Sequence, residues 1–172
     1  MAITTFAAID IGSYEISMKI FEFSKKIGFR QLNDVRYRLE IGKGAYSSGR
    51  LEPEIVDAIC GILKDFDKMM KEFGVSDYRA CATSAFREMV NPLIVQEQIY
   101  RRTGIHVEIL SNAEQHFLGY KSIAAKESSF KKMIQKGTAI LDVGGGGLQV
   151  SLFDKDALVT TPVSYTHLRA HE

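Results

Sequence analysis

The sequence predicts an α/β fold: one lobe with the order β-β-β-α-β-α-β-α, followed by an incomplete second copy of its opening. Two apolar runs, residues 7–11 and 139–143, each contain an aspartate followed by one apolar residue and then glycine. Between residues 16 and 73 the apolar spacing changes from alternating to helical. Such apolar runs are typical of buried central strands, and glycine lets a following turn bring its backbone N–H groups close to an anion. Two facing turns would clamp a phosphate chain.

Three strands are expected at the start of the chain. The first covers residues 6–11, and alternating apolar and polar residues predict two more over residues 15–20 and 35–41. Because the connections are short, the three strands are expected to pair antiparallel. Three glycines within residues 42–49 predict a loop.

Helical spacing of apolar residues then predicts a long helix over residues 53–74, which begins at a proline and ends at a glycine. Its apolar stripe belongs to the core. A strand at 78–82, a helix capped by Asn91 that runs to residue 104 and a strand at 107–110 complete the alternation.

Ser111 is expected to open a further helix through about Lys126, and the lysines within residues 131–136 indicate a solvated linker. Strands are then expected at 138–143, 148–153 and 157–160. The β-β-β opening is therefore repeated, with a second D-x-G sequence in its first hairpin.

Composition excludes several classes of function. The chain has 172 residues, 45% of them hydrophobic, and a net charge of +1, so nothing in its overall charge indicates a nucleic acid or membrane partner. No stretch approaches the roughly 20 apolar residues of a membrane span. No basic, apolar signal region opens the chain, and Cys60 and Cys81 are interpreted as core thiols, so a cytoplasmic location is expected.

Four segments together resemble the exopolyphosphatase/guanosine pentaphosphate phosphatase (Ppx/GppA) family in order and spacing: Ala8–Ser13, Ala82–Arg87, Leu110–Gln115 and Leu141–Gly146. This family lies within the actin-like ATPase superfamily, whose lobes are ribonuclease-H-like. The resemblance implies a phosphatase that removes terminal phosphate from inorganic polyphosphate or guanosine pentaphosphate, with magnesium, in a cleft between two lobes.

The same resemblance divides the chain. Residues 1–136 are expected to form the first actin-like lobe and residues 137–162 the start of a truncated second lobe. Residues 163–172 do not resemble the family and are interpreted as an artefactual tail, so no function is assigned to His167 or His171.

The resemblance also implies roles for particular residues. Asp10 and Asp142 match the two aspartates that would bind Mg²⁺, directly or through water; the alternative is that each carboxylate accepts nearby backbone N–H groups. Arg87 would bind phosphate oxygens, or else pair with Glu88 at the surface. The residues expected to bind phosphate are Gly12, Ser13, Arg87, Gly144, Gly145, Gly146 and Gly147.

Two acidic positions of the family pattern are glutamines here. Gln115 stands where the family has the glutamate that activates the attacking water, and Gln149 replaces a second acid. An amide is not basic near neutral pH, although glutamine can still orient a water. Glu114 points about 100° away around the helix and belongs to a capping box with Ser111, which gives it a structural task. Gln115, Glu114 and Gln149 are the candidate catalytic residues.

Two functions follow as hypotheses. One is a phosphatase acting on polyphosphate or a guanosine polyphosphate, favoured by Asp10, Arg87 and Asp142. The other is a degenerate module that binds the same ligands without turnover, favoured by the two glutamines. A third interpretation, an actin-like ATPase or sugar kinase, would need an adenosine pocket in the second lobe. A homodimer of the full-length protein is left open.

Overall fold

A computed structural model describes residues 3–25, 28–127, 129–144, 147–155, 157–160 and 163–164 of the chain. It divides into two compact units, Met1–Leu110 and Ser111–Glu172, each described here by itself. The expected lobe boundary at residue 136 stays a prediction. Within the described part of the chain, no helix is both long enough and apolar enough to cross a membrane.

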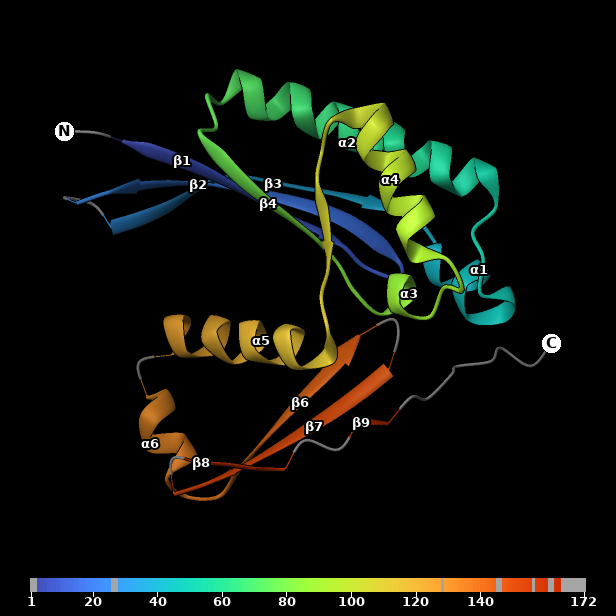
Figure 1. The fold of residues 1–172 in the computed structure, drawn as a ribbon. Helices are drawn as coiled ribbons and strands as arrows, with labels where there is room; N and C mark the ends of the chain where they lie inside the picture. The colour runs from blue at the N-terminus through green and yellow to red at the C-terminus, as the bar shows by residue number, and fades with distance from the viewer. Residues whose placement is uncertain are drawn as a thin grey trace. The chain divides into compact units, whose positions relative to one another are not determined.

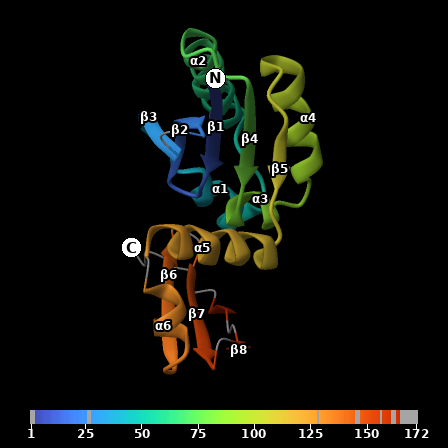
Figure 2. The same ribbon diagram turned by 90° about the vertical axis from the view of Figure 1, so that its left-hand side faces the viewer.

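The first unit is built on a five-stranded sheet with the order β3-β2-β1-β4-β5 (Figures 1 and 2). β1 pairs antiparallel with β2 and parallel with β4, and β5 continues the parallel half. The expected three-stranded antiparallel opening is therefore confirmed, but the third strand covers residues 28–38 instead of the predicted 35–41, because Ile41 already begins a helix. The strands are β1 (Thr4–Ile11), β2 (Glu15–Ser24), β3 (Gly28–Arg38), β4 (Asp77–Ala82) and β5 (Val107–Ile109).

Two helices, α2 and α4, cover one face of this sheet, and α1 and α3 lie at the end where β1 and β4 finish (Figure 1). The helices are α1 (Ile41–Ser48), α2 (Pro53–Glu72), α3 (Ser84–Arg87) and α4 (Pro92–Thr103). Alternate strand residues such as Ile9 and Met18 are buried against Leu63 and Phe66 of α2. This is the stripe that the helical spacing predicted.

The predicted glycine loop over residues 42–49 is wrong, because Ile41–Ser48 form α1. The glycines are needed there for close approach. A Cβ on Gly42 would lie 2.7 Å from the ring of Tyr46, and one on Gly44 would lie 2.7 Å from the carbonyl oxygen of Arg50. Gly49, with φ of 69°, then ends the helix in the left-handed region.

The helix expected from Asn91 is confirmed as α4, with Pro92 in its first turn and Gly104 ending it at φ of 73°. The side chain of Asn91, however, makes no cap hydrogen bond to this helix. The helix start therefore depends on proline and on packing of Val95 and Ile99 rather than on the expected cap.

In the part of the second unit that the structure describes, two helices accompany a small antiparallel sheet with the order β6-β7-β8, in which β9 also pairs with β7 (Figure 1). The solvated linker predicted from the lysines within residues 131–136 is wrong in part, since Lys131 and Lys132 lie exposed in α6. Val163–Ser164, assigned to a tail by sequence, form β9, and residues 165–172 lie outside the described residues. The elements are α5 (Asn112–Lys126), α6 (Phe130–Ile134), β6 (Thr138–Gly144), β7 (Gly147–Asp154), β8 (Ala157–Thr160) and β9 (Val163–Ser164).

The two faces of the β6–β7 hairpin differ in the burial of their side chains. Ser151 and Phe153 of β7 are buried, and the ring of Tyr120 in α5 packs edge-on against Phe153 at 5.1 Å between centroids. On the other face Leu141 and Val143 are 63% and 77% exposed. Helix α5 therefore packs against only one face of this hairpin.

We expect Leu63→Ala to lower the free energy of unfolding by about 2–5 kcal/mol, because it removes a fully buried side chain and leaves a cavity. The matched control is Leu93→Ala in α4, where the leucine is 71% exposed and the change should stay within about 0.5 kcal/mol. Urea unfolding measures both. Equal losses would mean that α2 does not form the core described here.

Candidate active site

Asp10 lies near the carboxyl end of β1, the strand that joins the antiparallel and parallel halves of the sheet. Its register partners are Ser17 of β2 and Cys81 of β4. Its side chain keeps access to solvent on the face opposite α2. The pKa of Asp10 is nevertheless raised, mainly because surrounding protein atoms desolvate the carboxylate, and secondarily because Glu15 is negatively charged. A carboxylate in this position gains from a nearby cation.

The turn after β1 is closed by backbone hydrogen bonds. The Gly12 N–H donates to the carbonyl oxygen of Glu15 at 2.9 Å, and a Cβ on Gly12 would lie 3.1 Å from that oxygen. The Gly42 N–H donates to the Ser13 carbonyl at 2.8 Å. The Gly12 N–H thus donates a hydrogen bond within the hairpin, and its contact with phosphate remains a prediction.

Ser13 is held by two further hydroxyl groups. Its Oγ lies 2.6 Å from the Tyr46 hydroxyl oxygen and 3.0 Å from Ser84 Oγ, and the last two are 2.9 Å apart. We call these three side chains the hydroxyl triangle. It joins the β1–β2 turn to α1 and α3. Tyr46 was not predicted from the sequence, because a contact between residues 33 positions apart leaves no local signal.

Arg87 lies at the end of α3, which follows β4 directly. Its Nη1 donates to the carbonyl oxygen of Leu110 at 2.7 Å, just after β5. The Thr83 N–H, at the start of α3, donates to the carbonyl of Ile11 at 3.3 Å. The structure therefore brings Asp10, the β1–β2 turn and Arg87 to the same end of one sheet, as the order of the motifs suggested.

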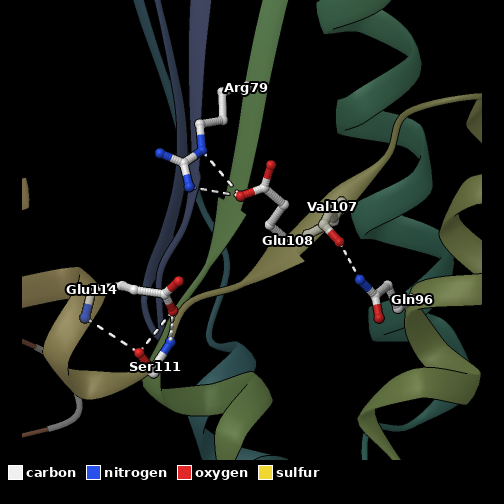
Figure 3. Close-up of polar contacts among 6 residues, drawn as sticks. All are labelled: Arg79, Gln96, Val107, Glu108, Ser111 and Glu114. Atoms are coloured by element: carbon white, nitrogen blue, oxygen red, sulfur yellow. Dashed lines mark hydrogen bonds and ion pairs between the residues drawn. The ribbon is translucent and has the colours of Figure 1, made fainter.

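Polar contacts also link β4 to β5 and β5 to α4 (Figure 3). Both Nε and Nη2 of Arg79 donate to Oε2 of Glu108, at 3.0 and 2.7 Å. The Gln96 amide donates to the carbonyl of Val107. Because the ion pair is exposed, it contributes at most about 1 kcal/mol.

In the second unit, Ser111 and Glu114 form the predicted capping box at the start of α5 (Figure 3). Ser111 N–H donates to Glu114 Oε2 at 2.9 Å, and Glu114 N–H donates to Ser111 Oγ at 3.2 Å. The structural task predicted for Glu114 is confirmed. Its candidacy as a base stays a prediction.

Gln115 follows in the first turn of α5. Its Oε1 is buried and accepts no hydrogen bond from the residues that the structure describes. A buried acceptor without a donor costs about 1–3 kcal/mol. A water or ligand that donated a hydrogen bond to Oε1 would relieve this cost, which is compatible with the predicted task of orienting a water.

Asp142 and Gln149 are directly opposite in the β6–β7 ladder, and Gly144 pairs with Gly147 at its end. Gly145 and Gly146, predicted to bind phosphate, lie outside the described residues. Among those described, no group of three or more His, Cys, Asp or Glu side chains forms a ready metal site.

The amide of Gln149 belongs to a buried polar cluster. Its Nε2 lies 3.2 Å from Ser151 Oγ and 3.5 Å from the Tyr120 hydroxyl, and these two hydroxyls also hydrogen bond. Gln149 is only 8% exposed. From the sequence Gln149 was interpreted only as a lost acid, and its amide's acceptors Tyr120 and Ser151 were not predicted.

The topology of the first sheet and the second D-x-G hairpin define a protein of the actin-like ATPase fold. A solved structure of the Aquifex aeolicus PPX-GPPA enzyme matches 95% of the chain with a TM-score of 0.79 at 21% identity, covering 53% of that structure. An exopolyphosphatase from Cytophaga hutchinsonii matches 95% of the chain with a TM-score of 0.76 at 20% identity, covering 51% of that structure.

A model of the Ppx/GppA phosphatase family matches residues 20–166, and the chain belongs to this family. Exopolyphosphatase 2 of Mycobacterium tuberculosis is 24% identical over 172 residues, which cover 93% of this chain and 51% of that protein. Exopolyphosphatase 1 of Mycobacterium leprae is 23% identical over 144 residues, covering 83% and 41%. The chain thus spans about half the length, or somewhat less, of these curated relatives.

Proposed function

We propose that the full-length protein releases terminal phosphate from inorganic polyphosphate, or from guanosine pentaphosphate, in a magnesium-dependent cleft between two lobes. The main support is the placement of Asp10, Ser13 and Arg87 at one end of a single sheet, in a member of a phosphatase family. Relatives named exopolyphosphatase favour the inorganic chain as substrate.

Asp10 fits a magnesium ligand. Its carboxylate is a hard oxygen donor, and its raised pKa means that the negative charge is poorly stabilised by the protein alone. When bound, magnesium would neutralise charge on the phosphate oxygens. Asp142 would supply a second carboxylate.

The remaining roles belong to groups that bind phosphate and order water. The guanidinium of Arg87, already fixed by the Leu110 carbonyl, would donate to a phosphate oxygen. Ser13 would add a hydroxyl donor, and the glycines of the second turn their backbone N–H groups. The Gln115 amide would orient the attacking water without taking its proton, so that turnover is slow.

The direct test is phosphate release by the full-length protein, with inorganic polyphosphate and guanosine pentaphosphate compared with and without Mg²⁺. Asp142→Asn should reduce release at least about a hundredfold, because one cation ligand is lost. Asp154→Asn, at the exposed end of β7, is the matched control and should leave release unchanged.

Three outcomes are informative. Magnesium-dependent release that needs Asp142 supports the proposal. Binding of polyphosphate without release would favour the degenerate binding module instead. Neither binding nor release with either compound would overturn both.

A further inference from the structure

The hydroxyl triangle can turn one hydrogen atom toward a ligand by giving up one of its three internal hydrogen bonds. Its three side chains, Ser13, Tyr46 and Ser84, bring three O–H hydrogens and three mutual oxygen–oxygen contacts of 2.6–3.0 Å. Each hydroxyl donates once and accepts up to twice. If Ser13 turns its hydrogen outward, it still accepts from Tyr46 and Ser84, and the Tyr46–Ser84 contact is then the one without a hydrogen bond. Its oxygen then stays in place while its hydrogen points to a ligand.

The position of Tyr46 in the triangle depends on Gly42. A Cβ on Gly42 would lie 2.7 Å from Cε2 of Tyr46 and 3.1 Å from Cβ of Ser13, so any larger residue would displace the ring or the turn. The Gly42 N–H also donates to the Ser13 carbonyl. One residue of α1 therefore fixes the backbone of Ser13 and makes room for the side chain that holds its hydroxyl.

Both ends of α1 are tied to the same part of the unit. At its end, the Val90 N–H donates to the Gly49 carbonyl at 2.9 Å, which links α1 to the segment after α3. Ser84 begins α3, and Arg87 ends it. A hydrogen bond from Tyr46 to either serine is thus made between two anchored elements.

We propose that Tyr46, together with Ser84, is a positioning residue that holds the Ser13 hydroxyl as a donor to a phosphate oxygen of the substrate. This inference rests on the proposed function and extends it to a residue of α1. Ser13 itself is only 5% exposed, so its hydroxyl is not free to rotate through solvent. Tyr46 acts on the substrate through Ser13 rather than by direct contact.

A double-mutant cycle in the full-length protein tests this dependence. Tyr46→Phe should raise KM for inorganic polyphosphate about three- to tenfold with little change in kcat, because one oriented hydrogen bond to bound substrate is weakened. In a Ser13→Ala background, the same Tyr46→Phe change should have no further effect on KM. That non-additivity is what a general structural role would not produce.

Tyr78→Phe is the matched control. The Tyr78 hydroxyl also accepts one hydrogen bond, from the His106 N–H at 3.0 Å, in the same unit. Tyr78→Phe should lower Tm to a similar extent as Tyr46→Phe and leave KM unchanged. If Tyr46→Phe does not fold, the cycle is run with Ser84→Ala, for which the same non-additivity is expected.

Results that contradict the role of Tyr46 differ from results that contradict the proposed function. Equal KM changes from Tyr46→Phe with and without Ser13, or an unchanged KM, would overturn the role of Tyr46 while phosphate release persists. A wild-type protein that neither binds nor cleaves polyphosphate would instead overturn the proposed function and, with it, this inference.

Discussion

Gln115→Glu in the full-length protein should raise the rate of phosphate release by about 10²–10⁴, the usual contribution of a positioned general base. The physical reason is that a carboxylate can take the proton of the attacking water, whereas an amide can only orient it. The buried setting of Gln115 Oε1 also favours a useful base, because desolvation raises the pKa of a carboxylate towards neutrality. Steady-state kcat as a function of pH is the measurement.

The control for Gln115→Glu is Gln98→Glu, which adds the same charge on the exposed surface of α4. It should leave kcat unchanged. If the wild-type protein is already fast and Gln115→Glu does nothing, Gln115 is not at the water position. Glu114 would then be the better candidate, despite its part in the capping box.

Asp10→Asn should have opposite effects on activity and stability. Phosphate release should fall at least about a hundredfold, because a ligand for the cation is lost. Tm at neutral pH should rise. The pKa of Asp10 is raised in the folded protein, so ionisation of Asp10 above that pKa disfavours folding, and asparagine removes this penalty.

The sign of the pH dependence distinguishes this explanation from a general packing effect. The gain in Tm from Asp10→Asn should be present at neutral pH and disappear as the pH falls through the raised pKa, since wild-type Asp10 is then neutral as well. Asp34→Asn is the opposite control, because a hydrogen bond from Arg36 lowers the pKa of Asp34. It should slightly reduce Tm at neutral pH and leave phosphate release unchanged.

Local patterns predicted most of the fold. The alternation in β2, the helical stripe of α2 and the capping box at Ser111 are each encoded within a few residues, so each was recognised. Helix α1 was not predicted, because several glycines close together are typical of a loop. They are present to admit Tyr46 and the Arg50 carbonyl, which only the folded chain brings near.

The candidate site was predictable to the extent that its residues lie in short motifs. Asp10 and Asp142 lie within recognisable strands, and Arg87 lies at the end of the short helix that follows β4. The partners that hold site residues in place were not predictable, because Tyr46 reaches Ser13 from α1 and Tyr120 reaches Gln149 from α5. Such contacts depend on which helix faces which strand, and single residues far apart in sequence carry no sign of it.

The parallel pairing of β1 with β4 also affects how the chain emerges during synthesis. β2 and β3 leave the ribosome directly after β1 and can pair with it at once, whereas β4 follows only after the whole of α1 and α2. Until then the strand that carries Asp10, central in the finished sheet, is an open edge that another nascent chain can pair with. Between the synthesis of residues 38 and 77 this edge is therefore open to misassembly, and a chaperone that covered it would prevent such pairing.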